Sequence, residues 1–196
     1  DIHALPNHGL GWLDASGDHA CIVLSTRIRL ARNLQGHAFG PRARVNDRKA
    51  VLEQTRRAMA KVELLAGSTL LELPEMDARN RGMLLERRLA SRELLGDAKT
   101  GPARATAVLL AAQDPLSVMV NEEDHFRLQG LVSGLRLQEA WDLVDRLDEE
   151  LGQELPFAYH HEFGFLTSCP TNVGSGLRAS VLVHLPGLVL TKEIGK

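Results

Sequence analysis

The densest group of ionisable side chains in the sequence is the heptapeptide Asn121-Glu122-Glu123-Asp124-His125-Phe126-Arg127. It directly follows the apolar run from Leu116 to Val120, and the end of a strand gives such side chains a rigid support beside a cleft. Three adjacent carboxylates repel one another unless a metal ion, an arginine or a substrate compensates their charge. The segment therefore indicates either a ligand site or a solvated acidic strand end.

A second segment, Leu166 to Ser180, combines small hydroxyl residues, glycines and one arginine. Backbone amides of such a loop can approach an anion closely, although most glycine turns are only turns. Its cysteine, Cys169, is either a reactive thiol among hydroxyls and cations or inert packing. The run Gly174 to Ala179 formally matches GxGxxA, but the residues after it favour a strand, so a dinucleotide fingerprint is not expected.

The third candidate lies in the run from Cys21 to Asn33, where apolar and polar residues alternate with the period of a half-buried strand. The alternation places Arg27 and Arg29 on one face. Two arginines on one strand face can clamp a polyphosphate through charge-assisted bonds. The alternative is a charged solvent face of an edge strand.

The remaining pattern predicts an α+β fold in which an antiparallel β-sheet is flanked by helices. Consecutive strands with short turns alternate here with single helices. The predicted helices span Asn46 (as N-cap) to about Leu65, a segment opened by Pro74, and Leu137 to Leu151. The predicted strands are Thr69 to Leu73, Thr106 to Ala112, Leu116 to Asn121, Phe126 to Val132, Phe157 to Phe163 and Arg178 to Leu185, with a polar loop over Gly96 to Ala105.

Composition narrows the possible class of protein further. With 196 residues, 44% of them apolar, the chain can bury a single sizeable core, and a net charge of −2 provides no basic field for nucleic acid. The sequence has no apolar run of transmembrane length, so we expect no membrane contact and a cytoplasmic location. His160, His161 and Glu162 match no standard zinc spacing.

Taken together, the three segments resemble the signature segments of guanidino (phosphagen) kinases, in the same order and at similar spacing. The motifs are Ser-Thr-Arg-Ile-Arg from Ser25, Asn-Glu-Glu-Asp-His from Asn121, and Cys-Pro-Thr-Asn-x-Gly-x-Gly-Leu-Arg-Ala-Ser from Cys169, within a similarity from about Ile22 to Thr191. The resemblance implies a guanidino kinase / glutamine synthetase-like catalytic domain over residues 21–196, after an irregular lead-in over residues 1–20. Because so few residues precede the first motif, the chain looks closest to bacterial protein-arginine kinases.

The resemblance also implies roles for individual residues. ATP, with Mg²⁺, would be bound by a set made of Ser25, Arg27, Arg29, Arg127 and Arg178. Glu123 would be the catalytic base, Glu122 would reach the magnesium through water, and Cys169 would orient the guanidinium, with Ser168 and Thr171 donating to its thiolate. Arg88 stands where related enzymes have a histidine against adenine, so we expect it to contact the base.

The family's second carboxylate and a further arginine lie downstream of the segment matching Leu182 to Thr191, so we expect the domain to be truncated at its C-terminal end. The leading hypothesis is phosphorylation of arginine side chains in protein substrates. Alternatives are a kinase of a small free guanidino compound and an inactive nucleotide-binding or regulatory fragment. Activator or regulatory proteins and a homodimer stay open as partners.

Overall fold

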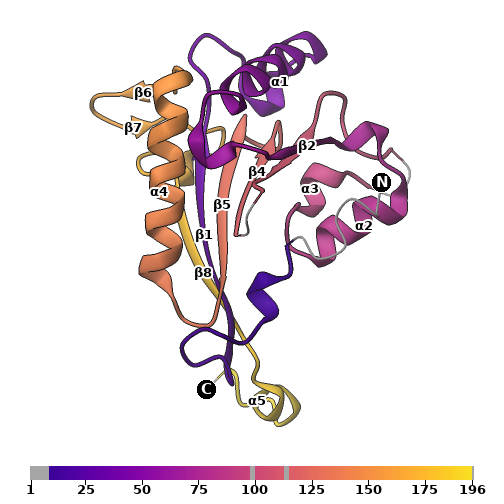
Figure 1. Ribbon diagram of the computed structural model, residues 1–196, viewed down its shortest axis with the longest axis vertical. Coiled ribbons are helices and arrows are strands. Elements are labelled where there is room, and N and C mark those ends of the chain that lie inside the picture. Colours follow the sequence, from indigo (N-terminus) through magenta and orange to yellow (C-terminus); the bar gives the residue numbers. More distant parts are fainter. Residues whose placement is uncertain (1–8, 98–99, 113–114, 196) are drawn as a thin grey trace.

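The computed structural model describes residues 9–97, 100–112 and 115–195. A six-stranded sheet with the order β2-β3-β4-β5-β1-β8 is its central element (Figure 1). Every neighbouring pair is antiparallel, which confirms the predicted fold class. The strands are β1 (Val23–Arg32), β2 (Thr69–Glu72), β3 (Ala107–Leu110), β4 (Leu116–Val120), β5 (Phe126–Ser133) and β8 (Leu177–Val183), and a separate hairpin joins β6 (Tyr159–His160) to β7 (Gly164–Phe165).

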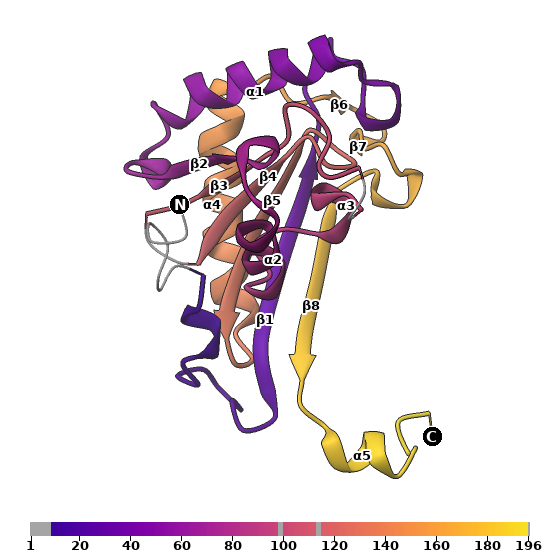
Figure 2. The same ribbon diagram turned by 90° about the vertical axis from the view of Figure 1, so that its right-hand side faces the viewer.

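Helices cover the two faces of the sheet unequally. Figure 2 shows the strands of the sheet side by side, with α4 behind the sheet and α2 in front of it. The helices are α1 (Val45–Met59), α2 (Ala78–Glu86), α3 (Arg92–Leu95), α4 (Leu137–Glu154) and α5 (Pro186–Leu190). Within the described part of the chain, no helix has both the length and the apolar character needed to cross a membrane.

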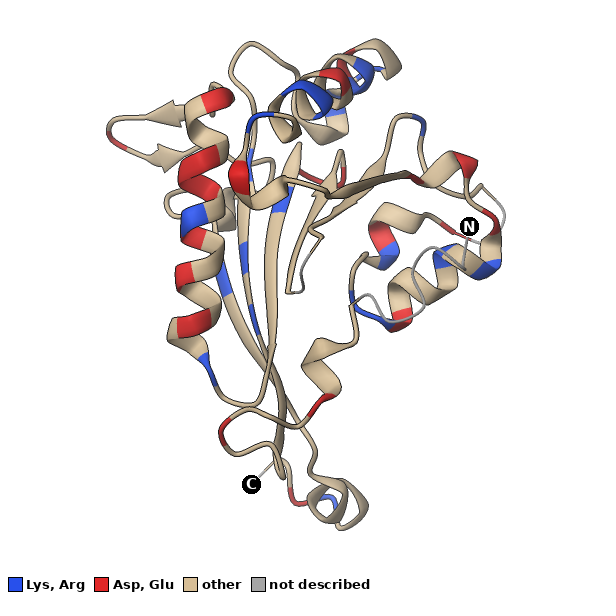
Figure 3. Cartoon of the chain, in the orientation of Figure 1, with Lys and Arg blue, Asp and Glu red and all other residues tan. Residues whose placement is uncertain are grey.

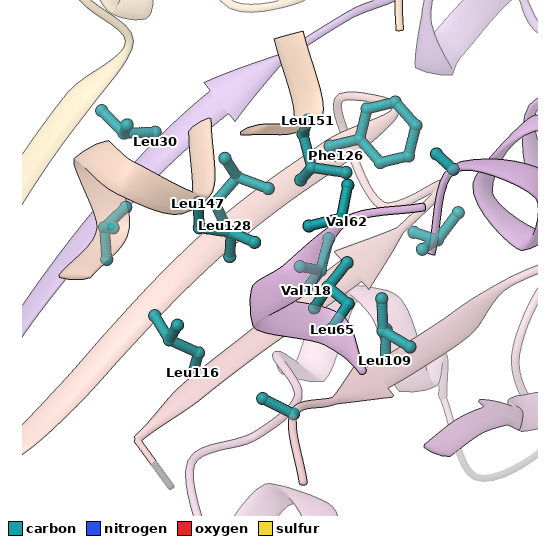
Figure 4. Close-up of a cluster of buried hydrophobic side chains, with 14 of the residues drawn as sticks. Leu30, Val62, Leu65, Leu109, Leu116, Val118, Phe126, Leu128, Leu147 and Leu151 are labelled. Atoms are coloured by element: carbon teal, nitrogen blue, oxygen red, sulfur yellow. The ribbon is translucent and has the colours of Figure 1, made fainter. Parts of the chain in front are cut away.

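The main core lies between one face of the sheet and the helices α1 and α4 (Figure 4). On β1 this face carries Ile28 and Leu30, and on β5 it carries Phe126 and Leu128. The apolar stripe of α4 packs on them through Ala140, Val144, Leu147 and Leu151. Since side chains alternate along a strand, every residue between these positions must face the other way.

A second, smaller cluster covers only part of the opposite face. Side chains of α2 and α3, such as Leu84 and Leu94, pack on Val108 of β3 and Met119 of β4. No described member of this cluster comes from β5, β1 or β8. The opposite face is thus covered over β3 and β4 and left free for polar side chains over the next three strands.

Two predicted helix starts were wrong. Helix α1 begins at Val45, not after an Asn46 cap, because the backbone N–H of Arg44 donates to Asp47 Oδ2 at 2.8 Å and closes the first turn there. The helix also ends at Met59, and a separate 3-10 turn covers Glu63–Leu65. Pro74 lies in a 3-10 turn, and α2 begins only at Ala78, where Asp77 accepts from the backbone N–H of Asn80.

The predicted strand over Phe157 to Phe163 is much shorter than expected. Only Tyr159–His160 pairs as a strand, because the chain turns at residues 161–163 and returns as Gly164–Phe165. The short helix α5 was not predicted. The hairpin of β3 and β4 is confirmed by its antiparallel register, although Gln113 and Asp114 lie outside the described residues.

The packing of α4 on β5 depends on Gly130. A Cβ at this position would lie 2.7 Å from Val144 Cγ2 and 3.2 Å from the carbonyl oxygen of Ala140. We expect Gly130→Ala to lower the free energy of unfolding by about 1–3 kcal/mol, because α4 must shift to make room. Urea titration measures the loss.

A matched control is Gly82→Ala in α2, where no atom other than those of the adjacent residues and the local helix backbone lies within 4 Å of an added Cβ. That change should raise the free energy of unfolding by up to about 1 kcal/mol, through helix propensity alone. Equal urea midpoints for the two variants would contradict the packing argument at Gly130.

Candidate active site

Four arginines gather on the free face of the sheet. Arg27 and Arg29 share this face of β1 by alternation, and Arg29 lies directly opposite Arg178 of β8. On the other neighbour, β5, Arg127 lies opposite Ala31, which is two residues beyond Arg29. Basic residues therefore occur on three adjacent strands, β5, β1 and β8 (Figure 3).

These arginines carry more positive charge than the neighbouring Glu122 and Glu123 compensate. Burial, and after it the charges of Arg27, Arg127 and Arg178, lower the pKa of Arg29 from its usual value to about 10, while Glu122 opposes the change. Burial also lowers the pKa of Arg27, again with neighbouring arginines adding to the effect. An anion bound among these side chains would relieve their mutual repulsion.

Two cavities meet at Arg29. The larger, of about 440 Å³, is lined by Arg27, Arg29, Arg88, Gln129 and residues of α2 and α3. The smaller, of about 200 Å³, is lined by Arg29, Arg127, Arg178, Glu123, Cys169, Thr171 and Asn172, among others. A hollow of about 710 Å³ beside α2 and α3 is larger than either, but none of the strand arginines lines it. The two cavities at Arg29 have the polar lining that chemistry requires.

The acidic turn separates its three carboxylates. Asn121 adopts a positive φ of 60°, and its backbone N–H donates to the carbonyl of His125 at 2.8 Å, so the turn is tight. Glu122 is buried and forms an ion pair with Arg127 at 2.6 Å. The side chain of Glu123 is 44% exposed and lines the smaller cavity. The expected repulsion among the three is therefore relieved, because each carboxylate has different surroundings.

Asp124, the third carboxylate, is buried and joins two loops. Its Oδ1 accepts from Asn33 Nδ2 at 2.6 Å and from the backbone N–H of Ser168 at 2.6 Å. The Ser168 hydroxyl in turn donates to the carbonyl of Glu123 at 2.8 Å. This network fixes Glu123 relative to Cys169. The sequence analysis missed Asn33, since an asparagine at a strand end has no distinguishing pattern.

Around Cys169, one of the two expected hydroxyl contacts is present. The hydroxyl of Thr171 lies 3.0 Å from Cys169 Sγ. The prediction for Ser168 was wrong, because its hydroxyl is engaged by the carbonyl of Glu123. Cys169 is partly buried and shares the smaller cavity with Glu123.

Arg88 and Ser25, the two remaining predicted contacts, have different surroundings. Arg88 lines the larger cavity, and its guanidinium lies 5.3 Å from the ring centroid of Trp12, a buried residue of the lead-in. The sequence analysis gave Trp12 no role. Ser25 is buried on the same strand face as Arg27 but lines neither cavity at Arg29.

A metal site made of protein ligands alone is not present in the described residues, where no three His, Cys, Asp or Glu side chains are suitably grouped. Both oxygens of Glu122 already have partners, since Ser91 Oγ donates to Oε1 and Arg127 lies 2.6 Å from Oε2. A cation at this site would therefore need oxygen ligands from the bound substrate.

The geometry agrees with a known family. The family model described as ATP:guanido phosphotransferase, C-terminal catalytic domain, matches residues 50–196. The chain belongs to this family.

The chain is also similar to individual members. It is 42% identical over 186 residues to the protein-arginine kinase of Pelotomaculum thermopropionicum, covering 93% of this chain and 51% of that protein. It is 45% identical over 188 residues to the protein-arginine kinase of Moorella thermoacetica, with coverage of 94% and 52%. The chain thus spans about half the length of these curated relatives.

Among solved structures, the duplicated taurocyamine kinase from Schistosoma mansoni with bound transition state analog components matches with a TM-score of 0.76. The two are 24% identical, and the match covers 88% of this chain and 25% of that one. At this identity the similarity shows a shared fold.

The repulsion among the arginines leads to a prediction for Arg29→Gln. Without anions, this variant should resist urea better than the parent chain, because it removes a half-buried cation from among three others. Inorganic phosphate should stabilise the parent by mass action and should stabilise the variant much less. Arg57→Gln, on the exposed side of α1, is the control and should respond to phosphate as the parent does. A phosphate response of the Arg29 variant equal to that of the parent would refute an anion site here.

His125 predicts a pH dependence of stability. Its Nδ1 accepts from the backbone N–H of Leu34 at 2.9 Å, which only the neutral ring can do, and burial lowers its pKa below the usual 6.5. The unfolded chain therefore binds more protons, so stability falls as the pH drops through 6.5 toward the lower folded pKa, by at most about 1.4 kcal/mol per pH unit.

Urea midpoints between pH 8 and pH 5 measure this effect. In His125→Gln the pH dependence should be smaller by the contribution of one proton, whereas His184→Gln, at an exposed position, should leave it unchanged. Identical pH profiles for His125→Gln and the parent would exclude this histidine as the cause.

Proposed function

We propose that this chain provides the catalytic domain, over residues 21–196, of an enzyme that transfers the γ-phosphoryl group of ATP to arginine side chains of proteins. The observation that carries the proposal is the position of Arg29 between two cavities. The larger cavity has further arginines, and the smaller one has a carboxylate and a thiol. A phosphoryl group bound at Arg29 would thus lie between ATP, its donor, in the larger cavity and the guanidino acceptor in the smaller cavity.

The donor side has the features that phosphoryl transfer requires. The reaction depends mainly on positioning and on neutralising the charge that spreads over the phosphate oxygens. Arg27, Arg29, Arg127 and Arg178 project from strands of one sheet, so their positions are rigid. Arg88, whose guanidinium lies near the ring of Trp12, would contact the adenine at the far end of the larger cavity. Ser25 is retained in the proposal as a more distant contact on the same face.

The acceptor side suits a cation. A guanidinium has a pKa above about 12 and becomes nucleophilic only when a base orients it and takes a proton. Glu123 is exposed enough in the smaller cavity to do this, and Cys169 would orient the guanidinium from the other side. The relatives named protein-arginine kinase support a protein acceptor over a small free guanidino compound.

A magnesium ion would bind to this site together with ATP. It would neutralise charge on the phosphate oxygens, and Glu122 would reach it through water, since both oxygens of this carboxylate already contact protein donors. The proposal also includes a cytoplasmic location. Activator or regulatory proteins and a homodimer are the partners to test.

Glu123→Gln tests the base in the full gene product. Loss of the proton acceptor should slow phosphoryl transfer by about 10²–10⁴-fold while the Kd for MgATP stays within about twofold. Labelled transfer and calorimetric titration measure the two quantities. Glu149→Gln, on the exposed face of α4, is the control and should retain both. Unimpaired transfer by the Glu123 variant would remove it from the base role.

The choice of acceptor separates the alternatives. Labelled ATP with casein should yield acid-labile phosphoarginine, whereas free arginine or creatine should not be labelled. Labelling of the free compounds alone would favour a small-molecule kinase, and MgATP binding without any transfer would favour a regulatory module.

A further inference from the structure

Arg32 belongs to the same strand as the phosphate-site arginines but has a different role. It is three residues beyond Arg29, so it lies on the α4 side of the sheet, and it is only 3% exposed. Its Nε and Nη2 donate to the two carboxylate oxygens of Asp148 on α4, at 2.9 and 2.7 Å. Its guanidinium lies 3.6 Å from the ring centroid of Phe165. The reaction proposed above makes no use of this residue.

The third nitrogen of Arg32 binds the loop of the acceptor cavity. Nη1 donates to the carbonyl of Ser175 at 2.8 Å and to the carbonyl of Ala31 at 2.8 Å. Gly176, the residue after Ser175, has a φ of 64°, and a Cβ on it would lie 2.8 Å from Arg32 Nη1. The guanidinium and the glycine turn are therefore fitted closely to each other.

The loop over residues 169–176 is held at both ends. At its beginning, the backbone N–H of Ser168 donates to Asp124, and at its end Arg32 binds Ser175. Between these two anchors lie Cys169, Thr171 and Asn172, which line the acceptor cavity. Movement of either anchor would move the wall against which a guanidinium must bind.

Stability alone does not require an arginine at this place. A buried ion pair gains little over well-packed apolar residues, because desolvation of the two charges offsets their attraction. A planar guanidinium, by contrast, can bind a carboxylate with one edge and backbone carbonyls with another, in a fixed geometry that lysine lacks. The guanidinium of Arg32 thus connects helix α4 directly to the turn at Gly176.

We propose that Arg32, oriented by Asp148, is a positioning residue that sets the affinity of the site for its guanidino acceptor by holding the loop over residues 169–176. The statement about affinity rests on the proposed function. The statement about the loop does not, and it can be tested without any activity.

The decisive variant is the double change Arg32→Met with Asp148→Leu. It removes the ion pair in favour of apolar side chains, so the fold should be retained, but it also removes the bonds to Ser175 and Ala31. In the full gene product, we expect the KM for an arginine-containing protein to rise about tenfold or more, with the KM for MgATP within about twofold of the parent. Hydrogen exchange of the amides in residues 169–177 should become faster, while the melting temperature stays near that of the parent.

Two single variants complete the design. Arg32→Lys retains a cation for Asp148 but loses the planar guanidinium with its several donors. The KM for the acceptor and the rate of amide hydrogen exchange in the loop should therefore lie between those of the parent and the double variant. Arg146→Met removes an exposed arginine of α4 that pairs with Glu150 and Glu63, and it should change neither readout.

Parental acceptor KM and parental loop exchange in the folded double variant would overturn the proposal. If the double variant does not fold, Arg32→Lys decides by the same two readouts. If the parent protein itself transfers no phosphoryl group, the proposed function fails, and hydrogen exchange alone then decides whether Arg32 holds the loop.

Discussion

The site depends on a sheet that can keep several arginines close together against their mutual repulsion. Arg27, Arg29, Arg127 and Arg178 project from three adjacent strands, and burial together with neighbouring charge lowers the pKa of Arg29 to about 10. Such a cluster raises the free energy of the unliganded state. The compensation comes from the other face of the same strands, where Ile28, Leu30, Phe126 and Leu128 belong to the main core with α4. Alternation along each strand thus links the binding face to the core face.

Two carboxylates, the buried Asp124 and the partly buried Asp148, connect the sheet to the loops that complete the site. Asp124 binds Asn33 and the backbone of Ser168, and so brings the acidic turn and the Cys169 loop together. Asp148 binds Arg32, which holds the far end of the same loop. Neither carboxylate lines the two cavities at Arg29, and each has one partner from β1 or its immediate continuation, Asn33 for Asp124 and Arg32 for Asp148. One strand therefore provides cavity-lining arginines on one face and loop anchors on the other.

The sequence predicted most of the sheet because alternation and apolar runs are local signals. Through motifs whose spacing is specific, it also grouped Glu123 and Cys169 with the strand arginines, and the structure places both at one cavity with Arg29, Arg127 and Arg178. It failed where the outcome depends on one hydrogen bond or on a distant partner. Asp47 fixed the start of α1 one residue before the expected cap, and Ser168 was bound by the carbonyl of Glu123 instead of approaching the thiol. The roles of Asn33, Trp12 and Asp148 arise from partners far away in the sequence, which a reading of local patterns does not find.

The acidic turn shows why adjacency in sequence is a poor guide to shared chemistry. Glu122, Glu123 and Asp124 are consecutive, but the left-handed conformation of Asn121 starts a turn that gives each one separate surroundings. Glu122 neutralises Arg127, Glu123 lines the cavity, and Asp124 is buried among donors. If all three faced one cavity, their repulsion would raise the pKa of at least one carboxylate and favour a metal ion. Because they are separated, Glu123 alone of the three lines the smaller cavity, while Glu122 and Asp124 bind neighbouring protein groups and hold the site together.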